Sequence, residues 1–337
     1  MIWLIFLGWA SAVVVAGTVI GPVTAALGER LRLGQAWAGT VLLSLATTLP
    51  EIVTTISVAG RGEVGIALGN IVGSCIFNLF ILVLVDLLSS RPVYDRLSAD
   101  HIATGLLGCA LLGLLIIGVG LGHVGMFGPA GPSVGPVGLT ALAILLLYGV
   151  GQYVVYRVAQ QSFEEPEHPK PGFWDYRSVP VLALAFALVA VVIIVSAYQL
   201  GLTVETIADR YALGATFAGA TLLGIVTSLP ELTNGIASTR RGHLDLVLGN
   251  VLGANAFLLF VLAVADVFFL NGALLYAVGQ TEALSAIIMA ATAIVMQTIV
   301  LGALAVRSTH RVWRASMVSV VLVALYVFSL VVAYRFA

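Results

Sequence analysis

Two short segments place a carboxylate directly after a proline inside long apolar stretches of the sequence. TTLPE and TSLPE contain the following oxygen-bearing side chains: Thr47, Thr48, Glu51, Thr227, Ser228 and Glu231. In each segment the hydroxyl residues lie three and four positions before the glutamate, so a helix would present all of them on one side. Carboxylate and hydroxyl oxygens are hard ligands of the kind that Ca²⁺ prefers. The two segments are therefore candidates for binding a cation.

The prolines of these segments add a further ligand. Because Pro50 has no N–H, the carbonyl of Ala46 loses its partner within the helix, and the helix bends there. Pro230 has the same effect on the carbonyl of Val226. An unpaired carbonyl in lipid costs several kcal/mol unless another group satisfies it, and a bound cation would do so.

The composition indicates the environment of these segments. The chain has 337 residues, of which 60% are hydrophobic and 9% are charged, and its mean hydropathy is +1.10. A soluble domain carries about 25% charged residues, which excludes that class. Ten uniformly apolar segments are each long enough to cross a bilayer as a helix, and they lack the alternation of a membrane barrel. They span residues 3–27, 35–59, 64–88, 102–121, 137–159, 179–200, 215–238, 244–270, 282–303 and 313–336.

The basic residues predict the orientation of these spans. If the N-terminus lies outside, only Arg61, Arg210 and Arg335 fall outside, and the other twelve of the fifteen Lys and Arg residues fall inside. Cytoplasmic loops carry such an excess of basic residues. We therefore expect a multi-pass protein of the cell membrane with both termini outside and a cytoplasmic linker at residues 161–178.

The sequence contains an internal repeat. Residues 29–86 align without a gap on residues 209–266, at an offset of 180 that equals the separation of Glu51 and Glu231. The shared residues include Pro, Glu, Arg, Asn and Asp, which apolar composition alone would not align. Each half (residues 1–160 and 179–337) has five spans, an odd number, so the halves enter the membrane from opposite sides. We expect an all-α polytopic fold of two inverted five-helix repeats with proline-broken helices 2 and 7, an architecture typical of secondary transporters.

The span after TTLPE carries a polar stripe and a stripe of small residues. The two stripes are Asn70, Ser74 and Asn78, and Gly65, Gly69 and Gly73. Both recur every four residues, so each occupies one helix face, and the glycines predict a close approach of another helix.

Other polar residues of the spans admit structural roles. Thr40, Thr54, Ser57 and Thr233 are expected to bond carbonyls of their own helices. Asp86 and Asp266 lie at span ends, where they either collect cations or are solvated. Ionisable groups inside a membrane span are different, because they are rare and usually functional, which separates Glu51 and Glu231 from this group.

The duplicated motifs resemble a known family. TTLPE followed by GNIVGSCIFN, and TSLPE followed by GNVLGANAFL, are similar to the two alpha-repeats of the sodium/calcium exchanger (cation/calcium antiporter) superfamily, prokaryotic type. The resemblance implies antiport of Ca²⁺ for Na⁺ by alternating access, with the ions as substrates and no cofactor. It implies that calcium is held by Glu51, Glu231, Thr47 and Thr227. It also implies that sodium binding involves Thr48, Ser228, Ser74 and Asn78.

The second repeat departs from the family pattern. Ala254 and Leu258 stand where the family usually has a serine and an acidic or amide residue, so sodium ligands are missing, although Asn234 could replace one. This leaves open coupling to H⁺, transport of Mg²⁺ or Mn²⁺, and a non-transporting sensor or scaffold. The sequence has no HExxH, GxSxG or paired-aspartate motif, so we do not expect an enzyme. A net charge of −1 with one lysine excludes nucleic acid as a partner, and the expected partners are cations and the lipid bilayer, with no obligatory protein partner.

Overall fold

The structure is a computed structural model that describes residues 1–31, 45–89, 93–94, 97, 101–126, 131–159, 173–174, 176–240, 244–312 and 315–336. Within these residues the regular secondary structure is helical apart from two short β-hairpins. The first half contains α1 (Ile2–Arg30), α3 (Leu49–Gly60), α4 (Val64–Leu88), α5 (His101–His123), β1 (Ser133–Val134), β2 (Val137–Gly138) and α6 (Leu139–Ala159). The second half contains α7 (Val179–Tyr211), α8 (Ala215–Ala218), a π-helical turn η1 (Gly219–Leu223), α9 (Gly224–Thr227), α10 (Leu229–Arg240), α11 (Leu244–Ala265), a 3₁₀ turn η2 (Asp266–Phe268), α12 (Gln280–Ala305), β3 (Arg311–Val312), β4 (Ala315–Ser316) and α13 (Met317–Arg335).

Most of these helices are long and apolar enough to cross a membrane. Eight of the described helices meet that condition, and the bent unit from Ala215 to Arg240 would make a ninth. The expected second span, residues 35–59, is represented by α3, and its earlier part lies outside the described residues. The protein is therefore an all-helical polytopic membrane protein, as predicted.

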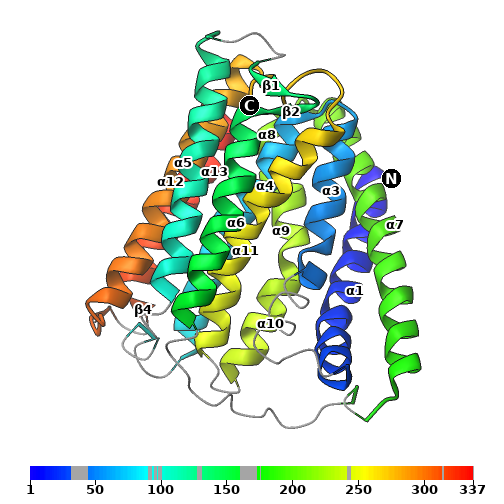
Figure 1. Cartoon of the computed structure of the whole chain (residues 1–337), viewed down its shortest axis with the longest axis vertical. Coiled ribbons are helices and arrows are strands. Elements are labelled where there is room, and N and C mark those ends of the chain that lie inside the picture. Colours follow the sequence, from blue (N-terminus) through cyan, green and yellow to red (C-terminus); the bar gives the residue numbers. More distant parts are fainter. Residues whose placement is uncertain are drawn as a thin grey trace.

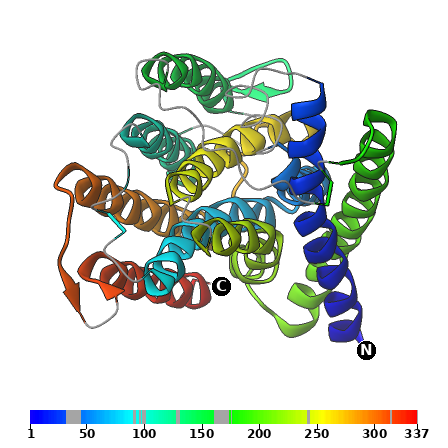
Figure 2. The ribbon, with the colours of Figure 1, turned by 90° about the horizontal axis from the view of Figure 1, so that it is seen from below.

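The helices form a bundle with a distinct pair on one flank. α1 and α7 pack against each other along their length and lie side by side in both views (Figures 1 and 2). α4 and α11 pack together nearer the centre, and α5 and α12 lie beyond them. Large apolar side chains remain exposed on the outer helices, among them Leu146, Val150, Leu184 and Leu188. Such a surface suits hydrocarbon rather than water.

The glycine stripe of α4 makes the predicted close contact. A Cβ on Gly69 would overlap the Thr216 carbonyl, and one on Gly73 would lie 2.5 Å from the Cα of Ala220. The segment that α4 approaches is the first half of the broken helix, formed by α8 and η1. Backbone therefore meets backbone at these glycines, and neither side can yield by rotating a side chain.

Replacing Gly73 by leucine is expected to destabilise the fold. Overpacking a tight interface costs about 1–3 kcal/mol and sometimes more, and here the obstacle is backbone. The measurement is the thermal unfolding midpoint of the purified protein in detergent. Gly113→Leu on α5 is the matched control, because a Cβ there meets no described atom within 4 Å. Equal midpoints for the two variants would contradict this packing.

Asp86 and Asp266 anchor the hairpins and are not solvated helix ends. Both side chains are buried. Asp86 accepts hydrogen bonds from the Ser316 N–H at 2.6 Å and the Ser319 hydroxyl at 2.8 Å, at the start of α13. Asp266 accepts from the Gly138 N–H at 2.6 Å, at the start of α6. Each aspartate thus fixes the last helix of the other half, which corrects the expectation that these groups face water.

Candidate functional site

Both motif segments break their helices in the same conformation. α9 ends at Thr227 and α10 begins at Leu229, with a bend of 42° between the two parts. The residue at this break, Ser228, has φ −89° and ψ 5°. In the first half α3 begins at Leu49, and the preceding Thr48 has φ −87° and ψ 6°. The proline of each motif then occupies the second position of the new helix, where its missing N–H costs nothing.

One backbone carbonyl at these breaks differs from the expectation. The Thr48 carbonyl accepts from the Ile52 N–H at 3.0 Å, and the Ser228 carbonyl accepts from the Leu232 N–H at 3.2 Å. The Val226 carbonyl accepts a backbone N–H at the end of α9, so the expectation that Pro230 frees it is wrong. A backbone N–H at the end of α9 takes the place of the N–H that Pro230 lacks.

The two breaks bring the glutamates of both halves together. The Ser228 hydroxyl donates to Oε1 of Glu51 at 3.1 Å, and the Glu51 and Glu231 carboxylates are close enough to repel each other. Thr227 lies beside Glu51, and Thr47 lies beside Glu231. Each half thus supplies groups to the other half's carboxylate. Thr48 is also buried at its break.

The carboxylates are buried with oxygen atoms that lack hydrogen-bond donors. Glu51 is 1% exposed and Glu231 is 2% exposed. Among the residues that the structure describes, Oε2 of Glu51, both carboxylate oxygens of Glu231 and Oδ1 of Asn78 have no hydrogen-bond partner. All four atoms are acceptors, and burying unpaired polar atoms is costly. A cation or a proton would supply what these oxygens lack.

The polar stripe of α4 faces the broken helix of the second half. The Ser74 hydroxyl donates to the Gly224 carbonyl at 3.2 Å. The Asn70 amide donates to the hydroxyls of Thr54 at 3.0 Å and Thr55 at 2.9 Å, and its oxygen accepts from Thr227 at 3.5 Å. Asn70 was part of the predicted stripe but not of the predicted ligand set, and its contact with Thr227 places it at the second break.

Asn78 takes part in a different network. Its amide donates to Oδ1 of Asn255 at 3.1 Å, on α11. Asn255 in turn donates to the Cys75 carbonyl at 3.1 Å and to Oε1 of Gln297 at 3.3 Å. Gln297, on α12, was not predicted, although a glutamine inside an apolar span was a visible signal. Ala254 and Leu258 are both buried on α11 and offer no side-chain oxygen to the site.

Several hydroxyls have the structural roles that the sequence suggested. Thr54 donates to the Pro50 carbonyl at 2.9 Å, Ser57 to the Thr54 carbonyl at 3.0 Å and Thr233 to the Leu229 carbonyl at 2.9 Å. Thr40 lies outside the described residues. The described part of the chain contains no cluster of three or more His, Cys, Asp or Glu side chains, so the site rests on two carboxylates and neutral oxygens.

Comparison with known sequences now decides the family. Residues 1–158 and 181–335 match the family described as "Sodium/calcium exchanger protein". The chain belongs to this family. It is therefore a membrane protein of the sodium/calcium exchanger family, as the resemblance of its two motifs predicted.

Individual relatives of this exchanger are distant. It is 26% identical over 230 residues to the inner membrane protein YrbG of Escherichia coli K12, a match that covers 65% of each chain. It is 25% identical over 277 residues to CaxA of Alkalimonas amylolytica, whose name describes a proposed antiporter, and this match covers 79% of each chain. The matched region thus spans slightly less than two thirds of YrbG.

Solved structures share the fold of the exchanger. The H⁺/Ca²⁺ exchanger CAX matches with a TM-score of 0.64 at 15% identity, covering 99% of this chain and 88% of CAX. The sodium-calcium exchanger NCX_Mj matches with a TM-score of 0.58 at 21% identity, covering 98% of this chain and 99% of NCX_Mj. At such identities the likeness concerns the fold alone.

Proposed function

We propose that this exchanger moves a divalent cation, most simply Ca²⁺ against Na⁺, by alternating access around Glu51 and Glu231. The observation that carries this proposal is the set of buried acceptors without donors, contributed by both halves of the chain at the two helix breaks. Oxygen ligands of this type suit Ca²⁺. In this proposal the transported ions are the substrates and no resident cofactor is required.

The charges of the site explain why it would exchange ions. Two ionised carboxylates in a membrane interior are costly when empty. One Ca²⁺, two Na⁺ or two protons would each neutralise both charges. Only a site that holds cations would then switch readily between opening to one side of the membrane and opening to the other. Release of one ion type must therefore be followed by binding of the other.

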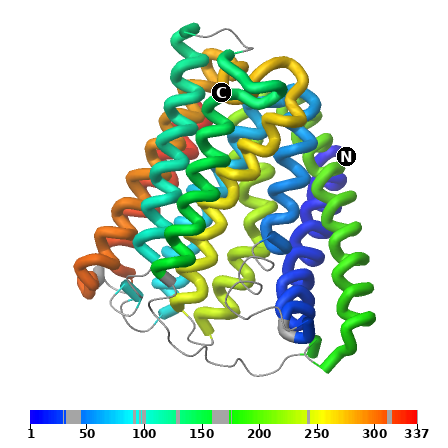
Figure 3. The backbone as a smooth tube through the Cα atoms, viewed as in Figure 1, coloured from blue at the N-terminus to red at the C-terminus, as the bar shows by residue number. Residues whose placement is uncertain are grey.

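The proposed architecture has ten spans in two inverted repeats, residues 1–160 and 179–337, joined by the linker at residues 161–178. The matching backbone angles at Thr48 and Ser228 support it. In each half a β-hairpin precedes the last helix, and an aspartate of the other half anchors it. α3 and α10 both begin near the middle of the long axis and run to opposite ends (Figure 3).

The proposed ligands form two sets, and each set draws on both halves of the chain. Glu51, Glu231, Thr47 and Thr227 would hold the divalent ion, and the second set would be Thr48, Ser228, Ser74 and Asn78. The unpartnered Asn78 oxygen supports its inclusion. Coupling to H⁺ is the second candidate, because the buried Ala254 and Leu258 leave fewer oxygens for sodium.

Flux measurements in proteoliposomes test this function. Calcium uptake should be driven by an opposing sodium gradient, and a separate experiment should apply only a pH gradient. Uptake with sodium alone supports the leading proposal, and uptake with the pH gradient alone supports proton coupling. Calcium binding without flux under either gradient would instead establish a sensor or scaffold.

The proposed orientation places both termini outside the cell. Both chain ends lie toward the end of the bundle where α5 ends (Figure 1). Single cysteines introduced by Met126→Cys and Ser162→Cys, in a background with Cys75→Ser and Cys109→Ala, should therefore react with an impermeant thiol reagent from opposite sides of the membrane. Met126 follows α5, and Ser162 belongs to the linker outside the described residues. Reaction of both from the same side would mean that the span count is wrong.

A further inference from the structure

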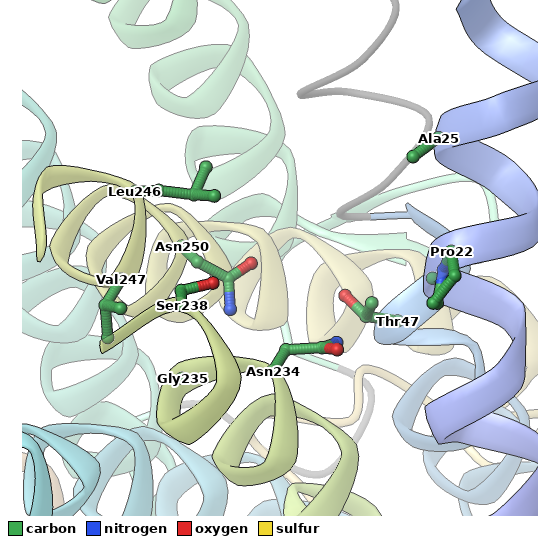
Figure 4. A pocket seen from close by; sticks show the side chains of 10 residues that line it. Pro22, Ala25, Thr47, Asn234, Gly235, Ser238, Leu246, Val247 and Asn250 are labelled. Carbon is green, nitrogen blue, oxygen red and sulfur yellow. The ribbon is translucent and has the colours of Figure 1, made fainter. Parts of the chain in front are cut away.

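A cavity of about 150 Å³ lies between α1, α10 and α11 (Figure 4). Its lining includes Pro22, Thr47, Asn234, Ser238, Leu246 and Asn250. It runs from Leu246, which is 57% exposed near the start of α11, to Thr47, which lies beside Glu231. The Asn234 amide points toward Thr47, and the Asn250 amide and Ser238 hydroxyl lie next to each other (Figure 4). These polar groups could replace part of the water around a cation that moves toward the carboxylates.

The repeat identifies a counterpart for each lining position. At the offset of 180 residues, Asn250, Asn234, Gly235 and Thr47 correspond to Asn70, Thr54, Thr55 and Thr227. These four counterparts are the hydrogen-bonded cluster described above, and each is completely buried. The same four positions are therefore sealed in one half and line a cavity in the other.

The difference continues toward the ends of the bundle. Ser238 of the cavity lining corresponds to Val58, and the same offset, continued past the aligned residues, places Gly21 opposite Gly201. Val58 is completely buried. Its side chain packs closely against Gly201, and this contact joins α3 to α7. On the cavity side, Pro22 of α1 is exposed. α3 thus closes on α7 in one half, whereas α1 borders an opening in the other.

An ion pair closes the sealed side at its outer end. Arg61, directly after α3, forms a salt bridge with Glu205 of α7, and its guanidinium lies 5.3 Å from the centre of the Tyr198 ring. Burial and then the charge of Glu205 raise the pKa of the neighbouring Glu63, while Arg61 lowers it. If the same offset is continued past the aligned residues 29–86, the position of Glu205 is taken by Ala25, which lines the cavity. The carboxylate of this pair therefore exists in only one half.

We propose that the cavity is an access path for hydrated cations, and that the cluster of Asn70, Thr54, Thr55 and Thr227 is the equivalent path of the other half in its closed form. The Arg61–Glu205 pair acts as a latch that keeps the second path closed. When one path opens, the other closes, because both are built from the same two broken helices. This inference rests on the proposed alternating access and adds the residues that line and close each path.

Cysteine accessibility tests the two paths without reference to the transported ion. In a Cys75→Ser, Cys109→Ala background, Ser238→Cys reports on the cavity and Val58→Cys on its closed counterpart. The probe is a water-soluble maleimide applied to the detergent-solubilised full chain, and the readout is the labelling rate. Ser238→Cys should react quickly and Val58→Cys slowly. Adding Glu205→Gln should raise the rate at position 58 by about two- to fivefold, the range expected for loss of a partly exposed ion pair, and should lower the rate at position 238.

Controls separate this result from general loosening of the fold. Val306→Cys, at a position 75% exposed beyond α12, should label equally with and without Glu205→Gln. The double exchange Arg61→Glu with Glu205→Arg should restore slow labelling at position 58. Rates that rise together at both reporters, or that do not respond to Glu205→Gln, would overturn the inference. Reciprocal labelling without any ion flux would support the paths while contradicting the proposed function.

Discussion

Replacing Glu51 or Glu231 by glutamine is expected to remove divalent cation transport while leaving the protein folded. Glutamine keeps the shape of the side chain but removes the charge, and it places an N–H₂ donor beside a cation. Interactions with charged groups are worth about 1.5–3 kcal/mol, and 1.4 kcal/mol is tenfold in binding. We therefore expect initial uptake in proteoliposomes to fall by about 10- to 100-fold or more in each variant.

Two controls make this result specific. Asp245→Asn removes a carboxylate that pairs with His101 at the start of α11, with an N–O distance of 3.3 Å, and should retain flux. Unfolding midpoints of Glu51→Gln and Glu231→Gln should equal or exceed that of the parent, because each replacement keeps the shape of the side chain and removes a carboxylate from a buried position. Near-normal uptake in either glutamine variant would show that the cation binds elsewhere.

The sequence predicted the elements whose signals are local. α4 has the predicted bounds, Val64–Leu88, because an apolar run follows a turn that contains Gly62. The two carboxylates of the candidate site were also singled out by the sequence, since an ionisable residue in a membrane span carries a high cost. The end of α7 was placed too early, because residues 201–211 continue the helix with polar groups until Ala212 adopts a left-handed conformation.

Contacts between helices were not predictable in the same way. Gln297 and Asn255 meet only because α11 and α12 both pack against α4 and α5, and a uniformly apolar helix does not reveal which face meets which neighbour. The anchoring roles of Asp86 and Asp266 depend on hairpins from the opposite half. The difference between the sealed cluster and the cavity was not predictable either, because the repeat shows which residues differ between the halves but not which side of the bundle is closed.

Transport by this exchanger is expected to depend little on membrane voltage. Leu258 is the repeat counterpart of Asn78, is buried and lies one turn beyond Asn255 on α11. An apolar side chain there supplies no oxygen for an additional monovalent ion. With two glutamate charges, the site would exchange two monovalent cations for one divalent cation, and no net charge would cross the membrane.

The initial rate of calcium uptake at clamped potentials measures this directly. One net charge moved through 100 mV is worth about 2.3 kcal/mol, or roughly 50-fold in an equilibrium constant. A transport cycle that moves net charge can therefore respond strongly to the membrane potential. We expect the parent rate to change by less than about twofold over that range. Leu258→Asp adds a third carboxylate, which would require one more monovalent ion for neutrality, and should introduce voltage dependence. Leu258→Asn, which restores an oxygen without a charge, should not. A strong voltage response in the parent, together with a strict sodium requirement, would show that other oxygens such as those of Asn234 or Asn255 replace the missing ligand.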